Sequence, residues 1–228
     1  MKPSLTVFGV LISAVVAGCA VDHHGVVTAL PDPFMHAVRP SATRVPTKAI
    51  RRRPNPRRFA PNTVSRAWHP PGGIRDRWKY IVIHHSASAR GSAALFDRYH
   101  RDVRHWDELG YHFVIGNGNG AGDGQVEVGP RWIKQKHGAH CKTSDNFYNR
   151  HGIGICLVGD FDGAPPTPAQ MASLTQLVKF LLQECRISPA DVVTHASVTG
   201  HTACPGRRFP LFAWRRSLSH SADLSVMP

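Results

Sequence analysis

The sequence lacks a long hydrophobic run, and it lacks an internal repeat. Its main apolar stretch without a charge, Leu5–Gly18, falls short of the roughly 20 residues that a helix needs to cross a bilayer. Hydrophobic residues make up 42% of the chain and charged residues 19%, which is ordinary for globular proteins. These values exclude wholesale disorder, a collagen-like chain and a polytopic membrane protein, and 228 residues suffice for one domain with appendages.

Acidic residues are absent between residues 33 and 75, where the chain carries ten basic residues. Half of the 18 prolines fall between Pro31 and Pro71, and no hydrophobic periodicity is present there. Residues 20–75 are therefore predicted to form a Pro/Arg-rich disordered tether, which serves as a spacer or contacts anionic lipid head groups or wall polymers. From Asp76 onward the chain holds 17 basic and 13 acidic residues, so the net charge of +13 mostly describes the tether.

Residues 1–19 have the pattern of a bacterial lipoprotein signal peptide. Lys2 precedes the apolar stretch, which ends in Val16-Ala17-Gly18-Cys19, a run that resembles a lipobox. The resemblance implies cleavage before Cys19 and lipidation of that thiol; the alternative is an ordinary secretory signal with a chance cysteine. Two acyl chains anchor a protein stably. Because Ala20 resembles the outer-membrane sorting pattern, we expect a cell-envelope protein on the periplasmic face of the outer membrane.

The texture changes to regular elements at Asp76. Short apolar segments predict five strands, at residues 79–84, 111–115, 125–128, 152–158 and 191–195, the second and third joined by a glycine-rich turn. The order of strands and helices predicts an α/β fold with a mixed central β-sheet flanked by helices. We expect one domain over residues 76–216, followed by a C-terminal tail over residues 217–228.

Two helices are predicted within this domain. The first carries an apolar stripe at helical spacing, formed by Leu95, Tyr99, Val103 and Trp106. The second begins at Thr167, with Pro168 as its first helical residue and Gln170 as the partner in a capping box. Its expected buried stripe comprises Met171, Leu174, Val178 and Leu181.

Three metal-ligating side chains stand out among 15 histidines and five cysteines. His84 and His195 each fall at the end of a predicted strand, and Cys204 lies nine residues beyond His195 in a loop. Two imidazoles and a thiolate suit zinc, and a three-ligand set leaves a fourth position for water, as in catalytic sites. The spacing alone is a weak signal, because coincidence could produce it.

Five ordered segments carry a more specific resemblance. They are Ile81–Ala87 (IVIHHSA), Gly110–Ile115 (GYHFVI), Gly138–His140 (GAH), Asn149–Gly154 (NRHGIG), and Thr194-His195 followed by Ala203–Gly206 (ACPG). Together they are similar to successive motifs of the zinc-dependent N-acetylmuramoyl-L-alanine amidase family, which includes phage lysozyme-amidases and peptidoglycan recognition proteins. The resemblance covers roughly residues 76–214. It implies hydrolysis of the amide bond between N-acetylmuramic acid and L-alanine in peptidoglycan.

The resemblance also implies roles for individual residues. Zn²⁺ would be held by His84, His195 and Cys204, and Tyr111 would lie beside the coordinated water, where a phenol can donate to a developing oxyanion. His85 is then structural. The segments that line the sugar-peptide groove in relatives imply substrate contacts for three residues, His112, His140 and Asn149. The alternative for His140 and Asn149 is that they only satisfy backbone groups of the loop.

One departure from the family pattern concerns catalysis. Phage-type relatives place a lysine two residues before the cysteine ligand, where this chain has Thr202. The loop is also one residue longer than usual, which brings His201 into it. We therefore expect His201 to act as transition-state stabiliser or proton donor, with Thr202 as a weaker catalytic contributor; the alternative is that His201 is a surface residue.

Several alternatives stay open. A peptidoglycan-binding module without hydrolysis would use the same fold, although inactive recognition proteins typically lose the cysteine ligand; amidases specific for 1,6-anhydro muropeptides usually carry Asp as third ligand. The expected partners are peptidoglycan or muropeptides and a membrane, which the protein would contact through the lipid anchor and the basic tether. We expect no nucleic acid partner. The protein is expected to be a monomer. Three further cysteines, Cys141, Cys156 and Cys185, permit one disulfide at most, and Cys156 is expected to be a buried thiol.

Overall fold

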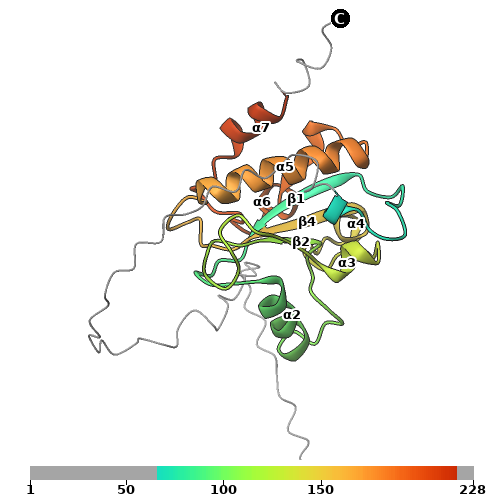
Figure 1. Cartoon of the computed structure of the whole chain (residues 1–228), viewed down its shortest axis with the longest axis horizontal. Coiled ribbons are helices and arrows are strands. Elements are labelled where there is room, and N and C mark those ends of the chain that lie inside the picture. The colour runs from blue at the N-terminus through green and yellow to red at the C-terminus, as the bar shows by residue number, and fades with distance from the viewer. Residues whose placement is uncertain (1–65, 220–228) are drawn as a thin grey trace, which may run out of the picture.

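The computed structural model describes residues 66–219 (Figure 1). The predicted signal peptide, Cys19, and the tether as far as residue 65 lie outside the described residues, as do residues 220–228 of the predicted tail. Within the described part of the chain, no helix combines the length and the apolarity that a membrane span requires.

A five-stranded sheet forms the centre of the domain, in the order β3-β2-β4-β1-β5. Strand β1 pairs in parallel with β4 and β5, and β2 pairs in parallel with β4 and antiparallel with β3. The predicted mixed α/β sheet is therefore confirmed. The strand bounds are Tyr80–His85 (β1), Phe113–Ile115 (β2), Val126–Val128 (β3), Gly152–Leu157 (β4) and Val192–Thr194 (β5).

Helices cover both faces of this sheet, with α5 (Pro168–Glu184) on one side and α2 (Ala93–Asp102) on the other (Figure 1). The inner strands are accordingly buried on both faces. Side chains alternate along β1, so Ile81 and Ile83 join the large apolar core under α5. His84 points to the α2 side, where its register neighbour Cys156 belongs to a smaller cluster. The candidate site therefore lies on the α2 face of the sheet.

Helix α5 matches its sequence prediction. Thr167 accepts the backbone N–H of Gln170, and the Gln170 side chain accepts that of Thr167, which is the predicted capping box. The buried stripe contains Leu174, Val178 and Leu181 as expected, together with Leu177, whereas Met171 is only partly buried.

Helix α2 departs from its prediction. It ends at Asp102, and Val103, expected in the buried stripe, is 47% exposed. The buried residues are Phe96 and His100 instead. These two lie one turn apart and pack toward the sheet, so the helix is rotated relative to the predicted stripe.

The remaining elements are short connecting helices and a C-terminal helix. They are α3 (Pro130–Ile133), α4 (Phe147–His151), a 3₁₀ helix (Pro189–Asp191), α6 (His195–Thr199) and α7 (Leu211–Ser219). All four cysteines in the described residues are free thiols, and Cys156 is fully buried in β4, as predicted.

The folded region extends further toward the N-terminus than the expected boundary at Asp76. Trp68 is only 5% exposed and belongs to the large core, where its ring meets the ring of Phe180 edge-on. Its backbone carbonyl accepts the indole N–H of Trp132 at 2.6 Å. The sequence did not indicate that the folded region begins before Asp76, because the residues around Trp68 share the Pro/Arg-rich composition of the tether. A single tryptophan does not change that average composition.

Candidate metal centre and its cavity

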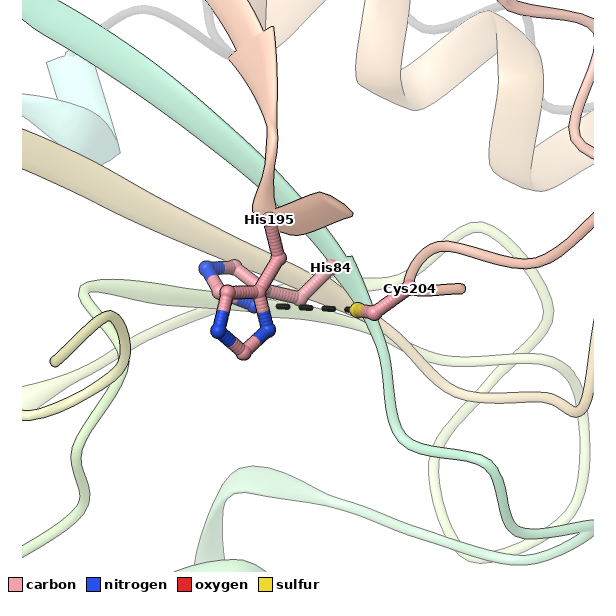
Figure 2. A group of neighbouring side chains, drawn as sticks. All are labelled: His84, His195 and Cys204. Carbon is pink, nitrogen blue, oxygen red and sulfur yellow. Dashed lines mark hydrogen bonds between the residues drawn. The ribbon is translucent and has the colours of Figure 1, made fainter. Parts of the chain in front are cut away.

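Three side chains from separate elements converge at one edge of the sheet (Figure 2). His84 lies near the carboxyl end of β1, and His195 directly follows β5, the parallel neighbour of β1. Cys204 reaches the same point from the loop after α6. One potential ligand atom from each residue lies within 4.8 Å of the other two. Parallel strands end at the same edge of a sheet, which is why the two strand-end histidines meet.

The spacing of these atoms fits a tetrahedral metal ion. His84 Nδ1 lies 3.8 Å from Cys204 Sγ. Zinc bonds of about 2.0 Å to nitrogen and about 2.3 Å to sulfur would place the two atoms roughly 3.6 Å apart. His84 therefore faces the centre with Nδ1, and the set offers two nitrogens and one sulfur.

The protonation states also suit a metal site. Burial lowers the pKa of His84 well below its usual value, and burial lowers that of His195 to about 4, so both imidazoles are neutral at neutral pH. Burial raises the pKa of the Cys204 thiol to about 12. The backbone N–H of His85 donates to Cys204 Sγ at 3.4 Å, which favours the thiolate once a metal displaces the proton.

His85 itself has a structural contact, as expected. Its Nδ1 accepts the backbone N–H of Phe161 at 3.1 Å, which ties the end of β1 to the loop after β4.

A cavity of about 970 Å³ opens beside the candidate metal centre. Among the predicted site residues, its wall includes Tyr111, His140, Asn149, His195, His201 and Thr202. The Tyr111 ring centroid lies 5.3 Å from that of His84. The structure thus brings Tyr111 and the His201–Thr202 loop to the same cavity as His195, one of the three candidate ligands, and their catalytic roles stay predictions.

His112 does not line this cavity, contrary to the expected substrate contact. Its side chain is fully buried, Nδ1 accepts the backbone N–H of Gly154 at 2.9 Å, and Nε2 lies 3.1 Å from the carbonyl oxygen of Lys136. Both ring nitrogens are therefore engaged with backbone groups. His112 lies in the bend directly before β2, and its ring packs edge-on against Trp78 and Trp132 instead of facing the open cavity.

Asn149 borders the cavity, but its side-chain oxygen and nitrogen form hydrogen bonds within the protein. Its Oδ1 accepts the backbone N–H groups of His140 and Cys141 at 2.8 and 2.9 Å. Its Nδ2 donates to Asn146 Oδ1 at 2.7 Å. Asn149 thus fixes the turn that carries His140, which agrees with the alternative that it satisfies loop backbone groups rather than with a direct substrate contact.

His140 is turned toward the metal centre. Its Nδ1 lies 3.0 Å from His84 Nε2, and its Nε2 lies 3.2 Å from the carbonyl oxygen of Gly152. The sequence motif placed His140 in the groove, but no spacing signal foretold a contact with His84.

Sequence reasoning also missed much of the opposite wall. His100 and Trp106 line the cavity with ring centroids 4.6 Å apart, and Arg104 lies over the Trp106 ring. Lys142 adds a second cation to the wall. The aromatic and basic residues around α2 were visible in the sequence, but their direction depended on where the helix ends.

The sequence of this chain is similar to a known protein family and to individual proteins from animals. The profile of one family, described as N-acetylmuramoyl-L-alanine amidase, matches residues 74–207. A mouse N-acetylmuramoyl-L-alanine amidase is 28% identical over 160 residues, which span 64% of this chain but only 27% of the mouse protein. Peptidoglycan-recognition protein SC1a of Drosophila melanogaster is 28% identical over 142 residues, 59% of this chain and 71% of the fly protein.

Solved structures agree with the sequence comparisons. The N-acetylmuramoyl-L-alanine amidase LysCS from Clostridium intestinale superposes with a TM-score of 0.54 at 30% identity, over 63% of this chain and 84% of that chain. Wild-type Drosophila PGRP-LB superposes with a TM-score of 0.50 at 27% identity, over 64% and 84% respectively.

Proposed function

This chain belongs to the N-acetylmuramoyl-L-alanine amidase family, and we propose that it hydrolyses the amide bond between N-acetylmuramic acid and L-alanine in peptidoglycan, with zinc as cofactor. The observation that carries the proposal is the convergence of His84, His195 and Cys204 beside an open cavity, whose wall includes His195. Peptidoglycan or its muropeptides would be the substrate.

The three residues would hold the ion, with His84 binding through Nδ1. A zinc ion there supplies Lewis acidity toward the amide carbonyl and lowers the pKa of a coordinated water. An open fourth position is the property that separates catalytic from structural zinc sites. The cavity beside the ligands gives substrate access to that position.

Two further side chains would assist the reaction. Tyr111 lies at the cavity wall beside His84, where its hydroxyl can donate to the oxyanion that develops on the amide oxygen. His201 is exposed on the same wall and can give a proton to the leaving amine. The role of Tyr111 follows from the family resemblance, whereas that of His201 follows from the longer loop that departs from the family pattern, and both residues line the cavity.

Binding without hydrolysis is the competing function, since the relatives include peptidoglycan-recognition proteins. The complete set of three ligands favours hydrolysis, because binding alone needs no open zinc position. An amidase restricted to 1,6-anhydro muropeptides is the second competitor, and it differs in substrate rather than in reaction.

Digestion of purified muropeptides tests the proposal. The protein should release free stem peptide and free glycan, detected by mass spectrometry, and a chelator should stop the release until Zn²⁺ is restored. Cys204→Ser should lower zinc content and product together. Muropeptide binding without any product in the zinc-loaded protein would instead establish a recognition module. Parallel digestion of anhydro and reduced muropeptides identifies the preferred substrate.

We also propose the domain organisation and location expected from the sequence: an anchored lipoprotein of the cell envelope, on the periplasmic face of the outer membrane, with the catalytic domain on a tether. The support is the run Val16–Cys19, followed by Ala20. Cys19→Ser should move the protein from the membrane fraction to the soluble fraction and remove the mass of the acyl chains. Unchanged fractionation and mass would refute acylation.

A further inference from the structure

We propose that His140 is a positioning residue for the metal, because it selects the tautomer of His84 that leaves Nδ1 free to bind zinc. The inference rests on the proposed zinc ligation by His84. It assigns to His140 a role that differs from the substrate contact that the sequence motif implied.

The first step is the tautomer of His140. Its Nε2 lies 3.2 Å from the carbonyl oxygen of Gly152, and a carbonyl oxygen can only accept a hydrogen bond. Nε2 therefore carries the ring hydrogen. A neutral imidazole has one N–H, and the partners of the two nitrogens of this buried ring are an imidazole and a carbonyl, not a carboxylate that would stabilise a second proton. Nδ1 of His140 is consequently left as an acceptor.

The second step is that the tautomer of His140 determines the tautomer of His84. Nε2 of His84 lies 3.0 Å from that Nδ1 acceptor, so it must donate and must carry the hydrogen. Nδ1 of His84 then has a lone pair, and it faces Cys204 Sγ at 3.8 Å. Two hydrogen bonds in series thus connect a strand carbonyl to the nitrogen that would bind the ion. Metal-bound histidines commonly donate their other ring N–H in this way, and loss of the partner weakens metal binding.

The protein holds His140 in a narrow slot. A Cβ at Gly138 or at Gly154 would each lie 2.4 Å from Cδ2 of His140, so both positions favour glycine for steric reasons. The backbone N–H of His140 donates to Asn149 Oδ1. These close approaches and the fixed backbone oppose a 180° rotation of the ring about χ2, which would put carbon atoms in the places of both nitrogens.

Substrate contact is a poorer account of His140. Its ring is 8% exposed although it borders the cavity. Both nitrogens already have partners within the protein. No polar atom of the ring remains for a sugar or a peptide.

The tautomers can be measured directly. In zinc-free protein, ring ¹⁵N shifts at neutral pH should show both His84 and His140 with hydrogen on Nε2. An Nδ1–H tautomer at His84 would overturn the proposal. This measurement needs neither zinc nor amidase activity, so it stands apart from the proposed function.

A pair of variants tests the consequence for zinc. The amide oxygen of His140→Asn reaches the place of Nδ1 and keeps an acceptor for His84. The longer His140→Gln reaches the place of Nε2 and keeps only the Gly152 contact. In competition with a chelator, we expect zinc affinity to fall about 10- to 100-fold in His140→Gln and to stay within about threefold of wild type in His140→Asn.

Control measurements separate the outcomes. His100 lines the same cavity but lies outside the hydrogen-bonded series, so His100→Asn should bind zinc as wild type does. Thermal unfolding of the zinc-free variants identifies a general loss of structure. Wild-type affinity in a folded His140→Gln, or equal weakening in folded His140→Asn, would overturn the proposal. A wild-type protein that binds no zinc would overturn the proposed cofactor, while the tautomer measurement would still judge the role of His140.

Discussion

The hydroxyl oxygen of Thr202 accepts the backbone N–H of Cys204 at 3.1 Å. The sequence comparison suggested a weak catalytic role for Thr202, because it replaces the lysine of phage-type relatives. The bond instead connects Thr202 to the shape of the loop that carries a candidate ligand. The carbonyl of Cys204 completes this attachment by accepting the N–H of Ala196 at 2.8 Å.

Thr202→Ala should therefore weaken zinc binding as well as turnover. Loss of one partly buried hydrogen bond costs about 1 kcal/mol, which corresponds to roughly a fivefold lower zinc affinity. Thr202→Ser keeps the hydroxyl and should retain wild-type affinity. Competition with a chelator measures the zinc affinity of both variants. Equal zinc affinities for both variants and the wild type would show that Thr202 does not stabilise the loop that carries Cys204.

Tyr111→Phe isolates the phenol hydroxyl. If this group stabilises the oxyanion, its removal should lower kcat about 10²-fold or more with zinc content unchanged. Steady-state hydrolysis of a defined muropeptide, paired with metal analysis of the same preparation, measures the effect. Wild-type kcat in Tyr111→Phe would confine the residue to shaping the cavity.

His201→Ala tests the loop insertion. Loss of a proton donor should lower kcat roughly 10²-fold at unchanged zinc stoichiometry. His201→Gln preserves a polar side chain without general acid capacity and should be similarly impaired. Near wild-type turnover in both variants would show that His201 is a surface residue without a catalytic role.

Acid should destabilise the zinc-free domain partly through His100. Its Nδ1 accepts the backbone N–H of Gly110 at 3.1 Å, and burial, assisted by the charge of Arg104, lowers its pKa to about 4. The unfolded chain binds this proton below about pH 6.5, whereas the folded chain does not until about pH 4. The free energy of unfolding should thus fall as pH drops through that window, by up to about 3 kcal/mol from this group.

His100→Asn keeps an acceptor near Nδ1 but does not titrate. Urea unfolding of both proteins from pH 7 to pH 4, with chelator present, should show a smaller loss of stability in the variant. Other buried histidines, such as His112, retain their own contribution to the slope. Identical pH dependence in the two proteins would contradict the role assigned to His100.

Removal of the segment before Asp76 should destabilise the domain. A chain beginning at Asp76 loses the buried Trp68 ring and leaves the Trp132 indole N–H without its carbonyl acceptor. Trp68→Ala in a chain beginning at Arg66 should cost about 3–5 kcal/mol, and the shorter chain at least as much. Denaturant midpoints are compared for the unsubstituted chain from Arg66, its Trp68→Ala variant and the chain from Asp76. Equal midpoints would show that the folded domain begins at Asp76, as the sequence predicted.

Local sequence determined much of this fold. Apolar β-branched runs gave β1 and β4 their positions because such residues suit a buried strand. The capping box at Thr167 fixed the start of α5 through hydrogen bonds that span only three residues. The ordered motifs also indicated the family and the three candidate ligands. His84 and His195 meet because neighbouring parallel strands end at the same edge of the sheet, whatever the intervening loops.

Tertiary structure alone decided where the surrounding side chains point. The packing of α2 on the sheet decided that Phe96 and His100 are its buried residues, and the bend before β2 left His112 buried while Tyr111 reached the cavity. His140 and His84 are 56 residues apart, and their contact depends on the pairing of β4 with β1 and on the turn fixed by Asn149. A hydrogen bond requires placement within a few tenths of an ångström, which only the complete packing of the domain supplies.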